Sequence, residues 1–303
     1  MEAALYGLLG IPVCFAGGAG GIQASVVCRP AGERPFSATW MKRTAKPCIP
    51  TAMQQLPWLE PGDALPDPAS AWGDTDPVPG LLAAGGALDV DTLVQAYSRC
   101  VFPWFSEDQP ILWWSPDPRM VLQVAEFKLH RSLRKTLARF AQTPGCEVRI
   151  DRDFSAVIKA CSQSPRTGQS GTWIVPDMVN AYMALHRAGH AHSVETWIDG
   201  KLAGGLYCVG LGRAVFGESM FSRRPDASKI ALAALVCLCR RFQVRMIDCQ
   251  QNTSHLASLG AREMSRASFV AHVAKAREQQ GPQWHFEPVY WTELLSTRPS
   301  EST

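Results

Sequence analysis

The amino-acid sequence predicts an α+β protein with a small N-terminal domain and a larger C-terminal domain. The chain has 303 residues, of which 46% are hydrophobic and 19% charged, and this balance suits a well-buried core. A turn-forming Thr-Pro-Gly at 143–145 separates two differently patterned halves. After it, helical and strand periods alternate, with three strand candidates in a row. We therefore expect domains at 53–142 and 143–292.

The N-terminal region, residues 1–52, shows no sustained helical or strand period. Its apolar run at 4–21 has no basic segment before it and is too short to span a bilayer comfortably. No later hydrophobic run is long enough either, so no membrane association is expected. We expect residues 1–52 to be either a disordered extension or a segment that is present because the start is wrongly assigned, in which case Met53 or Met41 is the true initiator. We expect residues 293–303 to be a disordered tail.

The small domain begins with repeated Pro, Gly and Asp, which are turn-forming residues. The apolar GLLAAGG at 80–86 reads as a turn, and a helix is expected from about Asp91, with Leu93, Ala96 and Tyr97 on its buried side. The stretch VFPWFSEDQPILWWSPDPR at 101–119 then combines three tryptophans with four prolines. Because proline rejects helix interiors and central strands, this stretch is expected to pack as a rigid, irregular segment. A short strand, MVLQV, follows it.

A basic amphipathic helix is predicted at 128–140. Leu129, Leu133 and Leu137 recur every four residues on one side. Five cations lie on the other side, with no acid among them: Lys128, Arg131, Arg134, Lys135 and Arg139. The overall charge of +3 does not reveal this local concentration of positive charge. The five cations are either an ordinary solvated helix face or a surface that contacts phosphates.

The large domain reads as a defined succession of elements. The strands are expected at 146–150, 191–198, 201–211, 213–221 and 243–250, and the helices at 154–161, 176–187, 226–242, 254–261 and 265–279. Short turns at Asp199-Gly200 and Gly212-Arg213 join three of the strands into hairpins. This order resembles the GNAT acyltransferase fold, and a resemblance of fold alone favours acyl transfer without proving it.

Cysteine and histidine patterns do not indicate a metal. None of the ten cysteines forms a CxxC pair, and abundant free cysteine is typical of a reduced compartment, hence the cytoplasm. His186, His190 and His192 resemble a cluster, but no fourth ligand accompanies them. We expect neither a metal nor another cofactor.

The donor of the acyl group is constrained by one loop. A GNAT enzyme that uses acyl-CoA cradles the pyrophosphate on a glycine-rich turn before a helix. The corresponding segment here, SMFSRRPDASK at 219–229, contains no glycine. Arg223, Arg224 and Lys229 could hold phosphates only through their side chains, so the acyl-CoA reading is disfavoured.

Several unusual blocks carry a more specific resemblance. They are GLLAAGG, FPWF, ILWWSPDPRMVL, RSLRKTL, GTWI, HAHSVE, GESMFSR, ASK, IDCQ and HLASLGA, in this order. Over about residues 54–290 the chain resembles the leucyl/phenylalanyl-tRNA–protein transferase family of bacteria. The resemblance implies transfer of Leu or Phe, and less well Met, from aminoacyl-tRNA to proteins with N-terminal Lys or Arg, which marks them for N-degron proteolysis. It also implies a GNAT-like catalytic domain and a cytoplasmic enzyme. We expect a monomer.

The same resemblance implies roles for three polar residues. Strand periodicity places Asp248 and Gln250 of IDCQ on one face. In the family motif Asp248 orients Gln250, and Gln250 accepts the proton of the attacking amine. Glu218 of GESMF would be costly to bury unpaired. It either pairs with an internal arginine or, as the resemblance implies, recognises the cationic acceptor N-terminus.

The resemblance further implies an apolar donor pocket, although each of its residues could be plain core. The pocket positions are Trp104, Trp173, Leu206, Val215, Met220 and Ile247. Thr253 stands where a family member is expected to carry Asn at a polar substrate contact. The five cations of 128–140 become candidate tRNA contacts. Two alternatives stay open: a GNAT-type N-acyltransferase that uses acyl-CoA, and a tRNA-binding protein without turnover.

Overall fold

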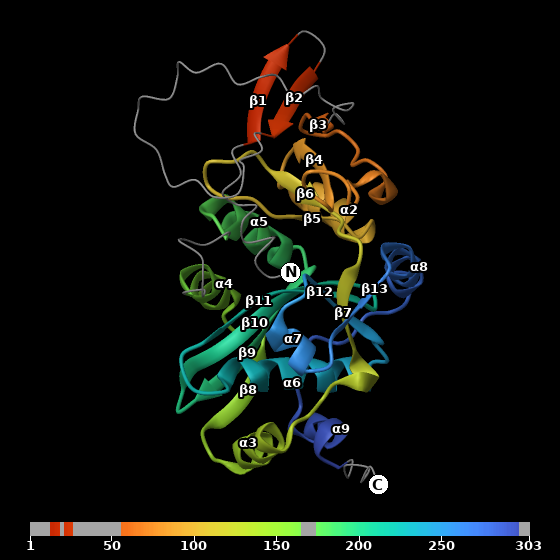
Figure 1. Cartoon of the computed structure of the whole chain (residues 1–303). Helices are drawn as coiled ribbons and strands as arrows, with labels where there is room; N and C mark the ends of the chain where they lie inside the picture. The colour runs from red at the N-terminus through yellow and green to blue at the C-terminus, as the bar shows by residue number, and fades with distance from the viewer. Residues whose placement is uncertain (1–12, 19–20, 27–55, 165–173, 297–303) are drawn as a thin grey trace, which may run out of the picture.

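The computed structural model describes residues 13–18, 21–26, 56–164 and 174–296. A small four-stranded sheet lies beside a larger seven-stranded sheet that carries most of the helices (Figure 1). The predicted extension 1–52 is described only at a hairpin of β1 (Val13–Gly18) and β2 (Gly21–Val26). The rest of that extension lies outside the described residues.

The small sheet has the strand order β3-β4-β6-β5. Its strands are β3 (Trp58–Leu59), β4 (Leu81–Gly85), β5 (Phe102–Pro103) and β6 (Leu112–Trp114). The turn predicted at 80–86 is wrong, because β4 is a strand. All five of its residues are buried, and a strand covered on both faces lacks the alternating pattern. The proline-rich stretch forms only the short β5 and β6, and Pro103 lies on an edge strand, where a missing N–H is tolerated.

The large sheet has the strand order β13-β7-β12-β11-β10-β9-β8. Its strands are β7 (Arg119–Gln123), β8 (Cys146–Ile150), β9 (Ala191–Ile198), β10 (Lys201–Leu211), β11 (Ala214–Ser222), β12 (Met246–Gln250) and β13 (Arg262–Met264). The predicted antiparallel run β9-β10-β11 is confirmed. Its turns use positive φ at Asp199, Gly200 and Gly212. β11 and β12 are parallel, and the long helix between them makes the crossover.

Helices cover both faces of the large sheet (Figure 1). They are α2 (Val90–Ser98), α3 (Arg131–Gln142), α4 (Phe154–Gln163), α5 (Pro176–Arg187), α6 (Ala227–Arg241), α7 (Ser254–Ser258), α8 (Arg266–Ala276) and α9 (Thr292–Leu295), with 3-10 turns at Pro68–Ser70, Val124–Glu126 and Pro288–Trp291. Alternate residues of β10 face different cores. Tyr207 packs with α4 and α5, whereas Leu206 packs with α6. α6 is buried around most of its circumference, as expected for a helix within a core.

Three boundaries differ from the sequence expectation. The small sheet ends at Trp114, and β7 already pairs with β12 and β13 in the large sheet, ahead of the boundary predicted at 142. The basic helix begins at Arg131 rather than at Lys128, and the Lys128 N–H donates to the Leu259 carbonyl at 2.8 Å. α9 lies within the tail predicted at 293–303, and its Leu294 is buried.

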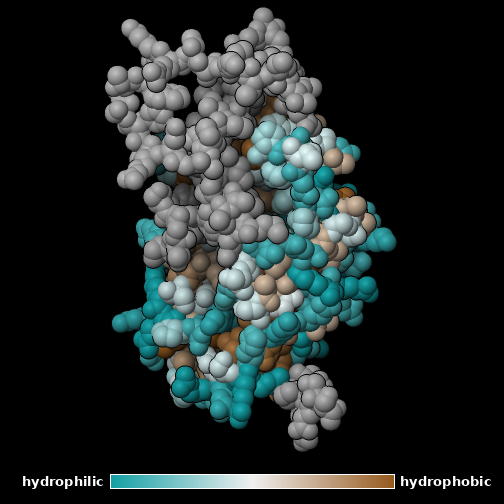
Figure 2. Space-filling model, viewed as in Figure 1, coloured by the Kyte–Doolittle hydropathy of each residue, from teal (hydrophilic) through white to brown (hydrophobic). Residues whose placement is uncertain are grey.

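Asp226 stands at the start of α6 as predicted, but its side chain does not cap the helix. Its backbone has a φ of +62°, and its carboxylate accepts a hydrogen bond from Lys229 Nζ at 2.9 Å. None of the helices in the described part of the chain is long and apolar enough to cross a bilayer. Hydrophilic residues are prominent on the face shown in Figure 2, with hydrophobic residues visible among them over α6 and α7.

Candidate active site

The centre of the site is a contact between the parallel strands β11 and β12. Their registered pairs are Val215 with Ile247 and Phe216 with Asp248. Past these pairs a side-chain contact continues between the strands, since Gln250 Nε2 donates to Glu218 Oε1 at 2.8 Å. Gln250 adopts a φ of +60° at a register shift of β12 against β7. The end of β12 therefore turns a side-chain amide toward the carboxylate of β11.

Glu218 is held by hydroxyl groups from two helices. Tyr97 of α2 donates to its Oε1 at 2.8 Å, and Tyr182 of α5 donates to its Oε2 at 3.2 Å. The two tyrosine hydroxyls also bond to each other. Among the described residues, no arginine or lysine forms an ion pair with Glu218, so the internal arginine considered from the sequence is not found there. Burial raises the pKa of Glu218 to about 8.

The two tyrosines act as neutral donors. Burial first, and then the negative charge of Glu218, raises the pKa of Tyr97 and of Tyr182 well above 10. Sequence reasoning assigned Tyr97 only to the buried side of its helix and did not single out Tyr182. Neither residue belongs to a motif that reveals its role, because α2 and α5 meet β11 only in the folded chain.

Asp248 is fully engaged in a buried ion pair. Arg119 Nε donates to its Oδ1 at 2.8 Å and Arg119 Nη2 to its Oδ2 at 2.6 Å, and both side chains are 1% exposed. The rings of Phe102 and Phe269 flank the guanidinium at 4.7 and 4.9 Å. Burial would lower the pKa of Arg119, but Asp248 raises it above its ordinary value. Arg119 therefore stays charged, and sequence reasoning missed it.

Asp248 and Gln250 are linked, as the pattern of IDCQ predicted, but through the main chain. Asp248 Oδ1 accepts a hydrogen bond from the backbone N–H of Gln250 at 2.9 Å. Asp248 is buried, whereas Gln250 is half-buried. The carboxylate thus fixes the backbone turn that carries Gln250, while the Gln250 amide meets Glu218. Asp248 therefore contacts Gln250 through the main chain and not through the Gln250 side chain.

A cavity of about 280 Å³ opens beside Glu218. Five of the predicted site residues line it together with Asp248: Leu206, Glu218, Met220, Ile247 and Thr253. Other lining residues were not singled out from the sequence, and they include Leu232 and Leu235 of α6 and His255 and Leu256 of α7. Most of this wall is apolar, and Glu218 is among the residues that line it.

Two of the predicted pocket residues that the structure describes do not line this cavity. Val215 is 2% exposed and packs in the core with α6. Trp104 is buried against Trp114, with ring centroids 5.5 Å apart, and its carbonyl accepts a hydrogen bond from Trp114 Nε1 at 2.7 Å. Trp173 lies outside the described residues. Thr253 does line the cavity, and its side chain also caps α7 by accepting from the Leu256 N–H.

The predicted tRNA-contacting helix lies away from this cavity. In Figure 1, α3 is at the end of the molecule opposite the small sheet, whereas α2 and α5 are close to that sheet. Leu133 and Leu137 are buried as predicted. Lys128, Arg131, Lys135 and Arg139 are exposed, and Arg134 is half-buried and donates to the Leu295 carbonyl at 3.1 Å. The structure thus presents four exposed cations on a common surface segment.

An apolar cavity beside a half-buried carboxylate and an amide suits an enzyme that transfers an apolar acyl group to an amine, which is the work of an aminoacyltransferase. Within the described residues, no group of three His, Cys, Asp or Glu side chains could hold a metal ion. Comparison with known proteins identifies the particular family. Residues 121–274 match the family model "Leucyl/phenylalanyl-tRNA protein transferase", and residues 86–117 match the model of its N-terminal domain.

Curated relatives agree with this match. The leucyl/phenylalanyl-tRNA–protein transferase of Polaromonas sp. (strain JS666) is 66% identical over 241 residues, which cover 80% of this chain and 94% of the relative. Those of Albidiferax ferrireducens and Methylibium petroleiphilum are 62% and 57% identical, over 80% and 81% of this chain and 95% and 94% of the relatives. The chain therefore belongs to the leucyl/phenylalanyl-tRNA–protein transferase family, and it is a transferase enzyme. The resemblance drawn from the sequence blocks is confirmed.

Proposed function

We propose that this enzyme moves Leu or Phe, and less well Met, from aminoacyl-tRNA to the α-amino group of proteins that begin with Lys or Arg. The product then carries an N-terminal residue that marks it for N-degron proteolysis. The observation that carries the proposal is Glu218, a carboxylate beside an apolar cavity that has hydroxyl and amide partners but no cation among the described residues. Family membership supports the same reaction.

The acceptor is expected to bind through Glu218. The carboxylate sits where burial raises its pKa to about 8, so its charged form lacks compensation in the free enzyme. A Lys or Arg side chain at the acceptor N-terminus would supply the missing positive charge. An Ala-starting protein would leave the carboxylate as it was. This difference gives the acceptor preference a physical basis.

The donor side chain is expected to enter the cavity beside Glu218. The apolar wall formed by Leu206, Met220 and Ile247 suits Leu or Phe. One methylene in such a pocket is worth only about 1–3 kcal/mol, so a Met side chain would also be accepted in part. We propose that Trp104 and Trp173 contribute further walls of the donor site, and that Val215 supports it from the core.

The chemistry needs no covalent enzyme intermediate, because the aminoacyl ester is already activated. The acceptor nitrogen attacks the ester carbonyl, the bond to the tRNA ribose oxygen breaks, and the proton of the amine passes finally to that oxygen. Gln250 donates through Nε2 to Glu218, which leaves its amide oxygen to accept the proton of the attacking amine. Asp248 holds the Gln250 backbone in this orientation. Both residues serve mainly to position the amine against the carbonyl.

The tRNA is expected to contact the exposed cations of α3 through its phosphates. We further propose that the domain expected at 143–292, together with β7 of the large sheet, is a GNAT-like catalytic domain, that the smaller domain expected at 53–142 precedes it, and that the enzyme works as a cytoplasmic monomer. A GNAT-like fold is supported by the order of its elements, with the parallel pair β11-β12 joined by α6.

One transfer assay tests the proposal. Labelled Phe-tRNA is incubated with the enzyme and three reporter proteins that differ only in starting with Lys, Arg or Ala, and a parallel reaction offers labelled acetyl-CoA. We expect label on the Lys and Arg reporters only, and none from acetyl-CoA. Transfer to the Ala reporter at an equal rate would contradict the role of Glu218. Label from acetyl-CoA would favour the acyl-CoA alternative, and tRNA binding without any transfer would favour a non-catalytic protein.

A further inference from the structure

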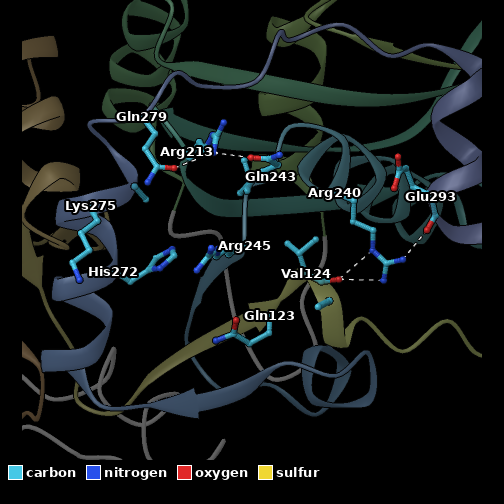
Figure 3. A pocket seen from close by; sticks show the side chains of 13 residues that line it. Gln123, Val124, Arg213, Arg240, Gln243, Arg245, His272, Lys275, Gln279 and Glu293 are labelled. Carbon is cyan, nitrogen blue, oxygen red and sulfur yellow. Dashed lines mark hydrogen bonds between the residues drawn. The ribbon is translucent and has the colours of Figure 1, made fainter.

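A second cavity, of about 960 Å³, lies apart from the active site. It shares no lining residue with the cavity beside Glu218. Its walls come from the end of β7, the β10–β11 turn, the end of α6 with the segment after it, and α8 and α9 (Figure 3). The catalytic roles proposed above use none of its side chains.

The charge of this groove is strongly one-sided. The cationic or titratable side chains that line it are Arg213, Arg240, Arg245, Lys275 and His272, and Glu293 is the only acid among the described residues that line it. In Figure 3, Glu293 lies next to Arg240 at one end, whereas His272 and Lys275 lie at the other end, near Arg245. Arg240 Nη1 donates to the main-chain carbonyl of Glu293, at 2.7 Å, and not to its carboxylate. The groove therefore keeps a net positive charge of several units.

Two of the arginines are fixed in place by neutral acceptors. Arg240 also donates to the Val124 carbonyl, at 3.3 Å from Nε and 3.2 Å from Nη2. Arg213 donates to the Gln280 carbonyl at 3.2 Å and to the side-chain oxygens of Gln243 and Gln279 at 3.2 and 3.1 Å. Neutral acceptors hold these guanidinium groups without cancelling their charge. They form a preorganised frame for an anion.

The other basic side chains of the groove have hydrogen-bond donors available for a ligand. Arg245 and Lys275 are exposed, and neither takes part in an ion pair within the described residues. The Nε2 atom of His272 is buried and has no hydrogen-bond partner in the described part of the chain. A buried ring nitrogen without a hydrogen-bond partner destabilises the folded protein. An oxygen atom of a bound ligand would supply this partner.

Compensation of helix dipoles explains only part of this cluster. Arg240 and Lys275 lie in the last turns of α6 and α8, where cations are favourable. Arg245 precedes β12, and Arg213 is in a strand turn, so no helix end accounts for either of them. The cations come from four separate parts of the chain and converge on one cavity.

We propose that this groove is a second binding site, which takes a compact phosphate-bearing anion such as the polyphosphate chain of a nucleotide. Its volume is in the range of small-molecule sites. Arg and Lys side chains together with the amides of Gln123, Gln243 and Gln279 can bind several phosphate oxygens at once. Among the described residues no Phe, Tyr or Trp lines the groove, so we expect the groove to recognise the phosphates rather than a base. A polyphosphate concentrates its charge on adjacent groups, whereas an RNA backbone spreads it along the strand.

Calorimetric titration of the full chain with inorganic tripolyphosphate, and separately with ATP, at about 0.15 M salt tests the proposal. The variant carries Arg245→Gln and Lys275→Gln. Its matched control carries Lys159→Gln and Lys201→Gln, two exposed lysines outside the groove. We expect both ligands to bind the wild type equally well, and the groove variant to bind at least about tenfold more weakly, because it has lost two cations that can donate charged hydrogen bonds to the anion. The control should bind as the wild type does.

A second readout follows the ring of His272 by NMR. Burial and the neighbouring Arg245 lower the pKa of His272, and a bound anion should raise it in the wild type and in the control. Equal affinity of the groove variant and its control, or binding lost at 0.15 M salt, would overturn the proposal. A third result would also overturn the proposal: tripolyphosphate does not bind, whereas tRNA without an attached amino acid binds the wild type and binds the groove variant more weakly. The groove would then be a contact for an RNA backbone.

Discussion

Replacing Glu218 by glutamine keeps the shape of the side chain and removes its charge. The amide oxygen can still accept from Tyr97 and Gln250 where Oε1 now does, and the amide nitrogen can donate to the Tyr182 hydroxyl. The hydrogen-bond network around β11 is therefore expected to survive. What changes is the response of the protein to pH.

The size of the change follows from the pKa of Glu218, which burial raises from an ordinary 4.5 to about 8. Between these two values the unfolded chain has released its proton while the folded protein retains it, so a rise in pH favours unfolding. The wild type should lose stability from about pH 4.5 to about pH 8, and Glu218→Gln should not. At about 1.4 kcal/mol per pKa unit the upper bound is about 5 kcal/mol. Because the carboxylate is only half-buried and opens on the cavity, we expect about 1–3 kcal/mol.

Urea unfolding followed by tryptophan fluorescence at several values between pH 5 and pH 8 measures the effect. The control is Glu60→Gln, which removes an exposed carboxylate of the small domain. Glu218→Gln should gain stability over the wild type as the pH rises, while its KM for an Arg-starting acceptor rises and its KM for Phe-tRNA changes little. A stability difference that does not vary with pH, or that matches the control, would refute the assignment of a buried, protonated carboxylate.

Three further results are expected. Asp248→Ala leaves the guanidinium of Arg119 buried without its carboxylate, and urea unfolding should show a loss of about 3–5 kcal/mol. Met220→Phe narrows the cavity, and in competition assays it should lower kcat/KM for Phe-tRNA about tenfold more than for Leu-tRNA. Lys135→Gln with Arg139→Gln removes two exposed cations of α3. This change should reduce the slope of log K for tRNA binding against log salt by about 1–2.

A specific outcome would contradict each of these three predictions. If Asp248→Ala unfolds at the same urea concentration as the wild type, the ion pair contributes little to the free energy of unfolding. Any loss of transfer activity in this variant would then be a catalytic effect. Equal losses with both donors for Met220→Phe would place the donor side chain elsewhere. An unchanged salt slope for the α3 variant, with the Lys159 and Lys201 variant as control, would leave the basic helix as an ordinary solvated surface.

Much of the large domain was predictable because its signals are local. β9, β10 and β11 have the lengths and turn residues of hairpins, and α4 and α5 carry clear helical periods with Asp153 and Pro176 at their starts. The three strands joined by short turns were found with nearly the correct bounds. Glu218 and the IDCQ pair could be singled out because each places a polar side chain in an otherwise apolar strand.

The rest depends on contacts between distant segments. β4 is buried on both faces and shows no alternation, and β13 has only three residues, so neither has a usable period. Tyr97 and Tyr182 are 85 residues apart in sequence, and their hydroxyls meet only through the packing of α2 and α5 against β11. The partner of Glu218 was expected to be a cation because a carboxylate in a strand requires compensation. Hydroxyl and amide groups bond to the carboxylate instead, and burial raises its pKa to about 8, which favours its neutral form.

Arg119 shows how one such contact organises the whole site. Its guanidinium holds Asp248, whose carboxylate fixes the backbone of Gln250. Its Nη1 also donates at 3.3 Å to the carbonyl of Cys100, which follows the helix that carries Tyr97. Gln250 and Tyr97 both bond to the same oxygen of Glu218. One buried guanidinium therefore braces two of the three side chains that bond to this carboxylate. The proline- and tryptophan-rich stretch that ends at Arg119 gives the guanidinium a rigid base, which is a reason for so stiff a segment at this place in the chain.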